Sequence, residues 1–202
     1  MNRYISMPQR KLLVVGVLAV GFLLSLAANN VSAQTYTDLH SFNCATEGCY
    51  PYYPAILAQG RDGNLYGTSW WGGTALYGAV FRVTPSGTLT TLSNLDCTGS
   101  AGCWAYGGLS LGTDGNLYGA NYEGGQYGYG TIFKTTPSGT LTVLHQFDGI
   151  APDWGSPWAP PVQGKDGNYY GIAAIVAYKI TAAGKFSVIS NLIPAAVSAP
   201  LI

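Results

Sequence analysis

The four cysteines carry the most reactive side chains of this 202-residue chain. They fall into two local pairs, Cys44 with Cys49 and Cys97 with Cys103. A redox motif would need C-x-x-C spacing and a zinc site would need histidine partners, and the sequence offers neither. Because cysteine pairs in exported proteins form disulfides, we expect two local disulfides, and we expect no metal or cofactor.

The two histidines and four loop carboxylates are the candidates for acid–base chemistry. His40 and His145 occupy one position in two copies of a repeat, and Ser93 and Ser190 occupy it in the other copies. A position that accepts serine indicates a polar strand residue more than a catalytic base. A glycosidase would need two carboxylates about 5 to 9.5 Å apart. The candidate carboxylates are Glu47, Glu123, Asp148 and Asp153.

Aromatic residues make up 13% of the chain and charged residues only 9%, which favours binding through rings over binding through charge. Rings on loops can stack on a sugar or on a partner protein. The alternative is that they pack between repeats, which glycine pairs such as Gly72-Gly73 favour. The candidate binding residues are Trp70, Trp71, Trp104, Trp158, Tyr52, Tyr106 and Tyr122.

A tandem repeat must position these residues. The motif D-G-N-L-Y-G starts at Asp62 and at Asp114, and D-G-N-Y-Y-G starts at Asp166, with a spacing of 52 residues both times. Asp-Gly between apolar runs is typical of a hairpin turn. We therefore expect the three aspartates to make turns, because calcium would recruit six or more oxygens and D-G-N offers too few.

Two further motifs accompany each D-G-N turn. The first reads V-F-R-V-T-P-S-G at residues 80–87 and returns at 132–139 and 177–184, so the third unit has lost seven residues. The second, an L-x-x-F-like element, starts at Leu39 and recurs three times. The predicted strands of the first unit are about 36–42, 54–58, 65–70 and 79–84.

Four antiparallel strands in about 50 residues predict an all-β fold of β-propeller-like blades. The units are about 35–87, 88–139 and 140–184, with a partial fourth at 185–202. Three units and one strand fall short of the usual four to eight blades, so we expect an incomplete or open ring. Truncation of a longer gene is the favoured explanation, and self-association is the second. Strand alternation places the aromatic loops opposite the D-G-N and P-S-G turns.

These linked motifs resemble the GloVer repeats, a family of secreted bacterial proteins, over essentially all of residues 35–192. The resemblance implies an extracellular or cell-surface, propeller-like protein with no established activity. A more distant likeness is to streptogramin-lyase-type propellers, which repeat similar strand and turn motifs. Their catalytic residues find no matching motif here, so no residue role is carried over.

The N-terminal residues 1–33 read as a signal peptide. Arg3, Arg10 and Lys11 precede an apolar run at 12–28, and small residues favour cleavage before Gln34. An uncleaved anchor is the alternative, but the run is shorter than the roughly 20 residues of a membrane-spanning helix. The remaining domain, 34–202, has six basic and nine acidic residues, which gives nucleic acid nothing to bind electrostatically.

Together these features predict a secreted or cell-surface protein that acts as a non-catalytic binding or scaffold module. The expected partner is an extracellular glycan or a surface protein, with no membrane span after cleavage. The alternative is an extracellular propeller hydrolase or lyase that acts on polysaccharide.

Overall fold

The computed structural model of the chain describes residues 36–51 and 57–192. The predicted signal peptide, the binding candidate Tyr52 and residues 193–202 lie outside the described residues. All strands belong to one compact unit, Asp38–Ile202. No helix of the described ranges is long and apolar enough to cross a membrane.

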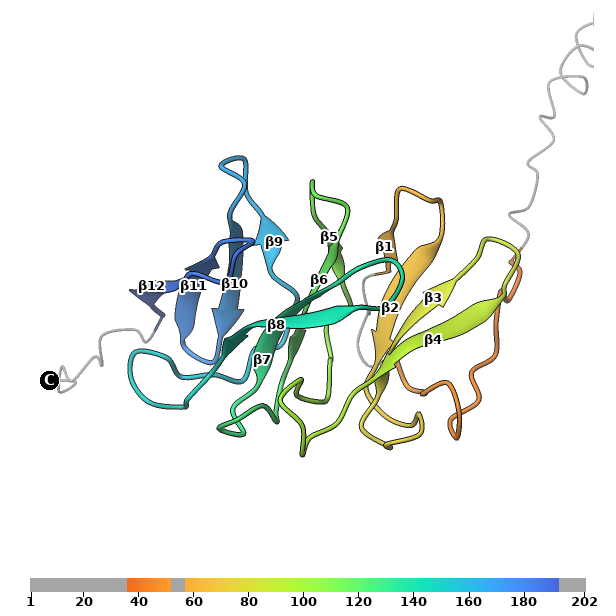
Figure 1. Ribbon diagram of the computed structural model, residues 1–202, viewed down its shortest axis with the longest axis horizontal. Coiled ribbons are helices and arrows are strands. Elements are labelled where there is room, and N and C mark those ends of the chain that lie inside the picture. Colours follow the sequence, from red (N-terminus) through yellow and green to blue (C-terminus); the bar gives the residue numbers. More distant parts are fainter. Residues whose placement is uncertain (1–35, 52–56, 193–202) are drawn as a thin grey trace, which may run out of the picture. The chain divides into compact units, whose positions relative to one another are not determined.

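Three four-stranded antiparallel sheets, here called blades 1 to 3, follow one another along the chain (Figure 1). Blade 1 comprises β1 (Ala58–Gln59), β2 (Leu65–Ser69), β3 (Ala79–Val83) and β4 (Leu89–Asn94). Blade 2 comprises β5 (Ser110–Leu111), β6 (Leu117–Asn121), β7 (Thr131–Thr135) and β8 (Leu141–Gln146). Blade 3 comprises β9 (Val162–Gln163), β10 (Tyr169–Ala173), β11 (Val176–Ile180) and β12 (Phe186–Asn191). The all-β, propeller-like fold with an open ring is thus as predicted.

The strand predicted at residues 36–42 is wrong, because these residues form no ladder. The tight P-S-G turn, closed by a bond from Thr84 N to Thr88 O (3.0 Å), folds the next L-x-x-F-like element back onto β3 as β4. Each such element therefore completes the blade before it, and β12 from the partial fourth unit completes blade 3. The first copy has no preceding strands to join among the described residues.

The same pattern of hydrogen bonds occurs in each of the three D-G-N turns, which confirms that the aspartates make turns. In the first, Asp62 Oδ1 accepts from the backbone of Asn64 (3.2 Å), and Oδ2 accepts from the Asn64 amide (2.7 Å) and from the Tyr66 hydroxyl (2.7 Å). Gly63 takes the positive φ that the turn needs. The Tyr66 and Asn64 bonds hold the pKa of Asp62 below its usual value. The same bonds recur around Asp114 and Asp166.

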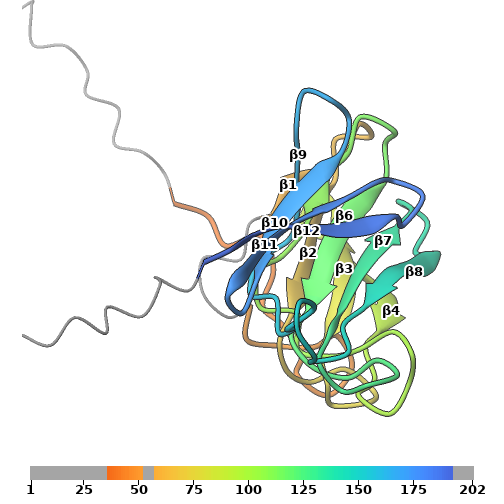
Figure 2. The same ribbon diagram turned by 90° about the vertical axis from the view of Figure 1, so that its left-hand side faces the viewer.

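Blades 1 and 2 are each covered by the apolar face of the next blade, and the sheets overlie one another in Figure 2. Tyr66 and Val80 of blade 1 lie in one cluster with Leu117 of blade 2. Tyr118 of blade 2 stacks on Tyr169 of blade 3, with ring centroids 3.8 Å apart. Because successive side chains of a strand point to opposite faces of the sheet, Leu117 contacts blade 1 while its neighbour Tyr118 contacts blade 3.

The last glycine of the D-G-N-L-Y-G motif makes room for an aromatic ring. Gly67 pairs with Phe81 across the ladder, and a Cβ at Gly67 would lie 2.7 Å from the Phe81 ring. Gly119 stands in the same relation to Phe133. A larger side chain at Gly119 would displace the Phe133 ring from the cluster between blades 1 and 2, and one at Gly67 would displace the Phe81 ring, which contacts Phe42.

The buried tyrosine of the D-G-N network supports a test of its contribution to stability. Tyr118 is fully buried and donates to Asp114 (2.8 Å), whereas the equivalent Tyr170 is only half-buried. Because a bond to a charged acceptor contributes about 1.5 to 3 kcal/mol when water cannot replace it, Tyr118→Phe should lower the free energy of unfolding by about that much. Urea denaturation measures the loss.

Tyr170→Phe is the matched control, because it removes the same bond to Asp166 where water can take its place. Its effect should be less than half that of Tyr118→Phe. Equal losses in the two variants would contradict the structural account of these turns.

Candidate functional site

The long loops lie together at the ends of the blades opposite the D-G-N turns, at the lower side of Figure 1. In blades 1 and 2 they are the β2–β3 loop (70–78) and the β6–β7 loop (122–130). The β4–β5 (95–109) and β8–β9 (147–161) connections reach the same side. Blade 3 has only Ala174 and Ile175 between β10 and β11, because the seven missing residues would have formed its loop.

Two local disulfides fix these loops, as the sequence predicts. Cys44 binds Cys49 with their Cα atoms 4.7 Å apart, and Cys97 binds Cys103 with Cα atoms 4.9 Å apart. Cys49 and Trp71 exchange two backbone hydrogen bonds of 2.6 and 3.2 Å. Cys103 and Glu123 do the same at 2.8 and 3.3 Å. Backbone hydrogen bonds therefore join the first disulfide loop to the β2–β3 loop and the second to the β6–β7 loop.

The residue after the disulfide loop takes a left-handed backbone conformation. Its φ is 52° at Tyr50, 58° at Trp104 and 54° at Ser156, the blade 3 equivalent. Such a conformation costs of order 1 to 3 kcal/mol for residues other than glycine. Trp104 N donates to Tyr77 O (3.3 Å), and Ser156 N donates to Tyr129 O (2.7 Å). The strain is therefore located where loops of adjacent blades join.

Six of the seven predicted binding residues form one continuous chain of ring contacts. Ring centroids are 5.8 Å apart for Trp71 and Trp70, 6.0 Å for Trp70 and Tyr106, and 5.2 Å for Tyr106 and Trp158. Tyr122 lies 4.6 Å from Trp158, and Trp104 lies 6.4 Å from Trp70. We call this set the aromatic row, and its members are Trp70, Trp71, Trp104, Tyr106, Tyr122 and Trp158.

The two ends of the aromatic row are open to solvent and its middle is not. Trp71 is 39% exposed and Trp158 is 53% exposed, whereas the other four rings are half-buried. Trp70 and Tyr106 lie nearly parallel (22°), as do Tyr106 and Trp158 (29°). Rings that stack on one another use up the faces that a sugar would need. The middle of the row thus packs between blades, whereas Trp71 and Trp158 keep part of their surface open to solvent.

Four more loop aromatics are as exposed as the row ends, although sequence reasoning did not select them. Tyr50, Tyr127, Tyr129 and Trp154 are 63%, 52%, 48% and 39% exposed. Their loop position could be derived from the strand order, but their exposure depends on contacts between loops that are distant in sequence.

Both histidines bind a carboxylate that follows them closely in the sequence. His40 Nε2 lies 2.9 Å from Glu47, and His145 Nε2 lies 2.9 Å from Asp153. Glu47 also accepts from the backbone of Asn43 (2.9 Å), and this bond and the His40 contact hold the pKa of Glu47 below its usual value. The His145 pair ties the end of β8 to the loop that follows it, and the His40 pair closes the segment before the first disulfide.

The remaining acidic candidates also serve the loop backbone. Asp148 Oδ1 accepts from Ile150 N (2.8 Å), and Glu123 bonds the disulfide loop through its backbone N–H and C=O. Within the described part of the chain, no three His, Cys, Asp or Glu side chains gather as metal ligands would.

Comparisons with known proteins agree with the repeat architecture. The profile of a family described as the Gloeobacter/Verrucomicrobia repeat matches residues 21–199. No curated protein matches the chain.

Solved structures similar to the chain include virginiamycin B lyase from Staphylococcus aureus, at 19% identity and a TM-score of 0.49, covering 70% of this chain and 42% of that one. A streptogramin B lyase structure matches at 17% identity and a TM-score of 0.48, covering 70% and 41%. A gluconolactonase from Xanthomonas campestris matches at 14% identity and a TM-score of 0.44, covering 70% and 50%. The chain thus spans at most half the length of these proteins.

The disulfide in the β4–β5 connection provides a test of how the loops are held. Replacing Cys97 and Cys103 together by alanine should lower the free energy of unfolding by about 2 kcal/mol, the chain entropy of so short a loop. Trp104 should gain contact with water, and its fluorescence should shift to the red. Urea titration and emission spectra measure both effects.

The matched control replaces Cys44 and Cys49, which close a loop of similar length. This double variant should lower the free energy of unfolding by a similar amount but leave the Trp104 emission unchanged. The Trp104 emission is obtained as the difference between spectra recorded with and without the Trp104→Phe substitution. Unchanged stability and emission in the first variant would show that the disulfide does not hold this loop.

Proposed function

The chain belongs to the Gloeobacter/Verrucomicrobia repeat family, in agreement with its sequence motifs. We propose that it is an extracellular, non-catalytic binding module. Its ligand is a glycan, bound by ring stacking at the two ends of the aromatic row. The observation that carries this proposal is the joining of loops from all three blades in one row of rings with exposed Trp71 and Trp158.

The ends of the row supply the contact area that a sugar ring needs. A tryptophan face offers a large, rigid apolar surface, and its indole N–H adds a hydrogen-bond donor. Charge contributes little, because only nine basic and nine acidic residues occur in the whole chain. Binding should therefore be weak and insensitive to salt, unlike the capture of an ionic ligand.

Two disulfides support an extracellular location, since disulfides persist in oxidising compartments and are rare in the cytosol. They agree with the signal peptide predicted at residues 1–33. Reduction of the bonds would loosen the loops that present Trp71 and Trp104, so the binding surface depends on the oxidised state.

The loop chemistry favours binding over catalysis. A polysaccharide hydrolase would need two carboxylates placed about 5 to 9.5 Å apart across its substrate. Glu47 and Asp153 instead bind histidines that precede them closely in the sequence, and Asp148 caps a turn. No observation favours the hydrolase or lyase alternative over these structural uses.

A glycan array followed by fluorescence titration tests the proposal. A bound glycan should quench the indole emission equally in low and high salt. Trp71→Ala and Trp158→Ala should each weaken binding about tenfold, which corresponds to about 1.4 kcal/mol, and should leave the unfolding temperature unchanged because both rings are exposed.

Trp154→Ala is the matched control, because Trp154 is as exposed as Trp71 but has no ring contact in the row. It should bind like the parent protein. The proposal is wrong if no glycan quenches the emission, or if Trp154→Ala and Trp71→Ala weaken binding equally.

A further inference from the structure

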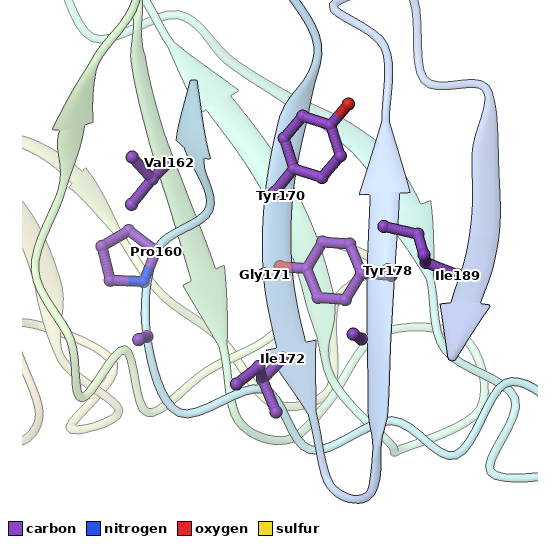
Figure 3. A pocket seen from close by; sticks show the side chains of 9 residues that line it. Pro160, Val162, Tyr170, Gly171, Ile172, Tyr178 and Ile189 are labelled. Carbon is purple, nitrogen blue, oxygen red and sulfur yellow. The ribbon is translucent and has the colours of Figure 1, made fainter. Parts of the chain in front are cut away.

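Blade 3 leaves uncovered the face that blades 1 and 2 each turn toward their successor. Tyr66 and Tyr118, on this face of blades 1 and 2, are fully buried, whereas the equivalent Tyr170 is half-buried. Val162 is 64% exposed and Ile189 is 55% exposed. Figure 3 shows these side chains around a shallow hollow, whose apolar lining also includes Pro160, Ile172 and Tyr178.

The complementary face is present at the other end of the same chain. Leu109 of blade 2 is fully buried against blade 1, whereas its blade 1 equivalent, Leu57, is 46% exposed. Leu65 and Leu89 are half-buried, although Leu117, the equivalent of Leu65, is fully buried against blade 1. The chain thus exposes both halves of an interface that it forms internally twice.

We propose that the outer face of blade 3 docks on the outer face of blade 1 of a second copy of this chain, and that two copies close a six-bladed ring. The second copy is the occupant that the observations favour, because its blade 1 repeats the faces that already cover blades 1 and 2. Head-to-tail contacts form rings when their rotation closes. Six blades lie within the usual range of about four to eight.

Two polar contacts between blades 2 and 3 have sequence equivalents at this junction. Lys134 Nζ donates to Ala182 O (3.2 Å), and the backbone N–H of Thr113 donates to Gln163 Oε1 (2.8 Å). The equivalents across the proposed junction are Lys179 with Pro85 of the second copy, and Lys165 with Gln59 of the second copy. Each donor thus has the matching acceptor.

The segment Asp38–Phe42 must give way for this contact. It lies on blade 1 where a fourth strand of a preceding blade would lie, since Gly87 packs on Leu39 as Gly139 packs on Leu92. In the ring, β12 of the second copy takes this place. The exchange breaks the contact of His40 Nδ1 with Gly87 O (3.2 Å) and the ring contact of Phe42 with Phe81 (5.1 Å), but no ladder bonds, because residues 38–42 belong to no ladder.

Sedimentation of the full mature chain over a range of concentrations tests the proposal. The parent protein should approach twice the monomer mass. Val162→Glu and Leu57→Glu should each weaken association at least tenfold, because each buries an unpaired charge at a junction. Ile150→Glu is the control: Ile150 is 68% exposed on the β8–β9 connection, outside both faces, and the variant should associate normally.

Mixing the two face variants distinguishes head-to-tail docking from a symmetric contact. The Leu57→Glu chain retains an intact blade 3 face and the Val162→Glu chain an intact blade 1 face, so the mixture should regain mixed dimers through one junction. A monomer at all concentrations, a ladder of larger species, or association that Leu57→Glu leaves unchanged would overturn the proposal.

Discussion

The packing of each blade's apolar face against the next blade is the interaction on which the rest of this structure depends. A single repeat unit, here a four-stranded sheet with strands of two to six residues, cannot bury its apolar face alone, and stacking neighbours buries a continuous core. Tyr118 and Tyr169 meet face to face between blades 2 and 3, and Tyr66 and Leu117 share the cluster between blades 1 and 2. The D-G-N network, which orients the tyrosine hydroxyl, makes that packing repeatable from unit to unit.

The binding surface follows from the same stacking. Once the blades are side by side, loops that are distant in sequence bond one another, as Trp104 N does when it donates to Tyr77 O (3.3 Å). Disulfides and histidine–carboxylate pairs shape each loop locally, and the rings of neighbouring loops then fill the space between them. The aromatic row forms because each repeat places aromatic residues in equivalent loops. Within it, Trp71 and Trp158 are the exposed rings and the other four are half-buried.

Local signals made most of the fold predictable from the sequence. The D-G-N and P-S-G turns fix strand order and direction, and the cysteine spacing gives both disulfides. Residues 36–42 were predicted as a strand because they match β4, but a strand forms only where a partner exists, and pairing is not a local property. Likewise, the sequence places Trp70 and Trp158 on one side of the blades, while their different exposure depends on neighbours from other units.

Hydrogen–deuterium exchange of the monomer, at a concentration too low for association, tests most directly the claim that each blade is stabilised by its neighbours. Blade 2 is covered on both faces, whereas blade 3 has one face open. The account predicts that amides of β6 and β7 exchange more slowly than their equivalents in β10 and β11. Equal protection of the two blades under these conditions would contradict it.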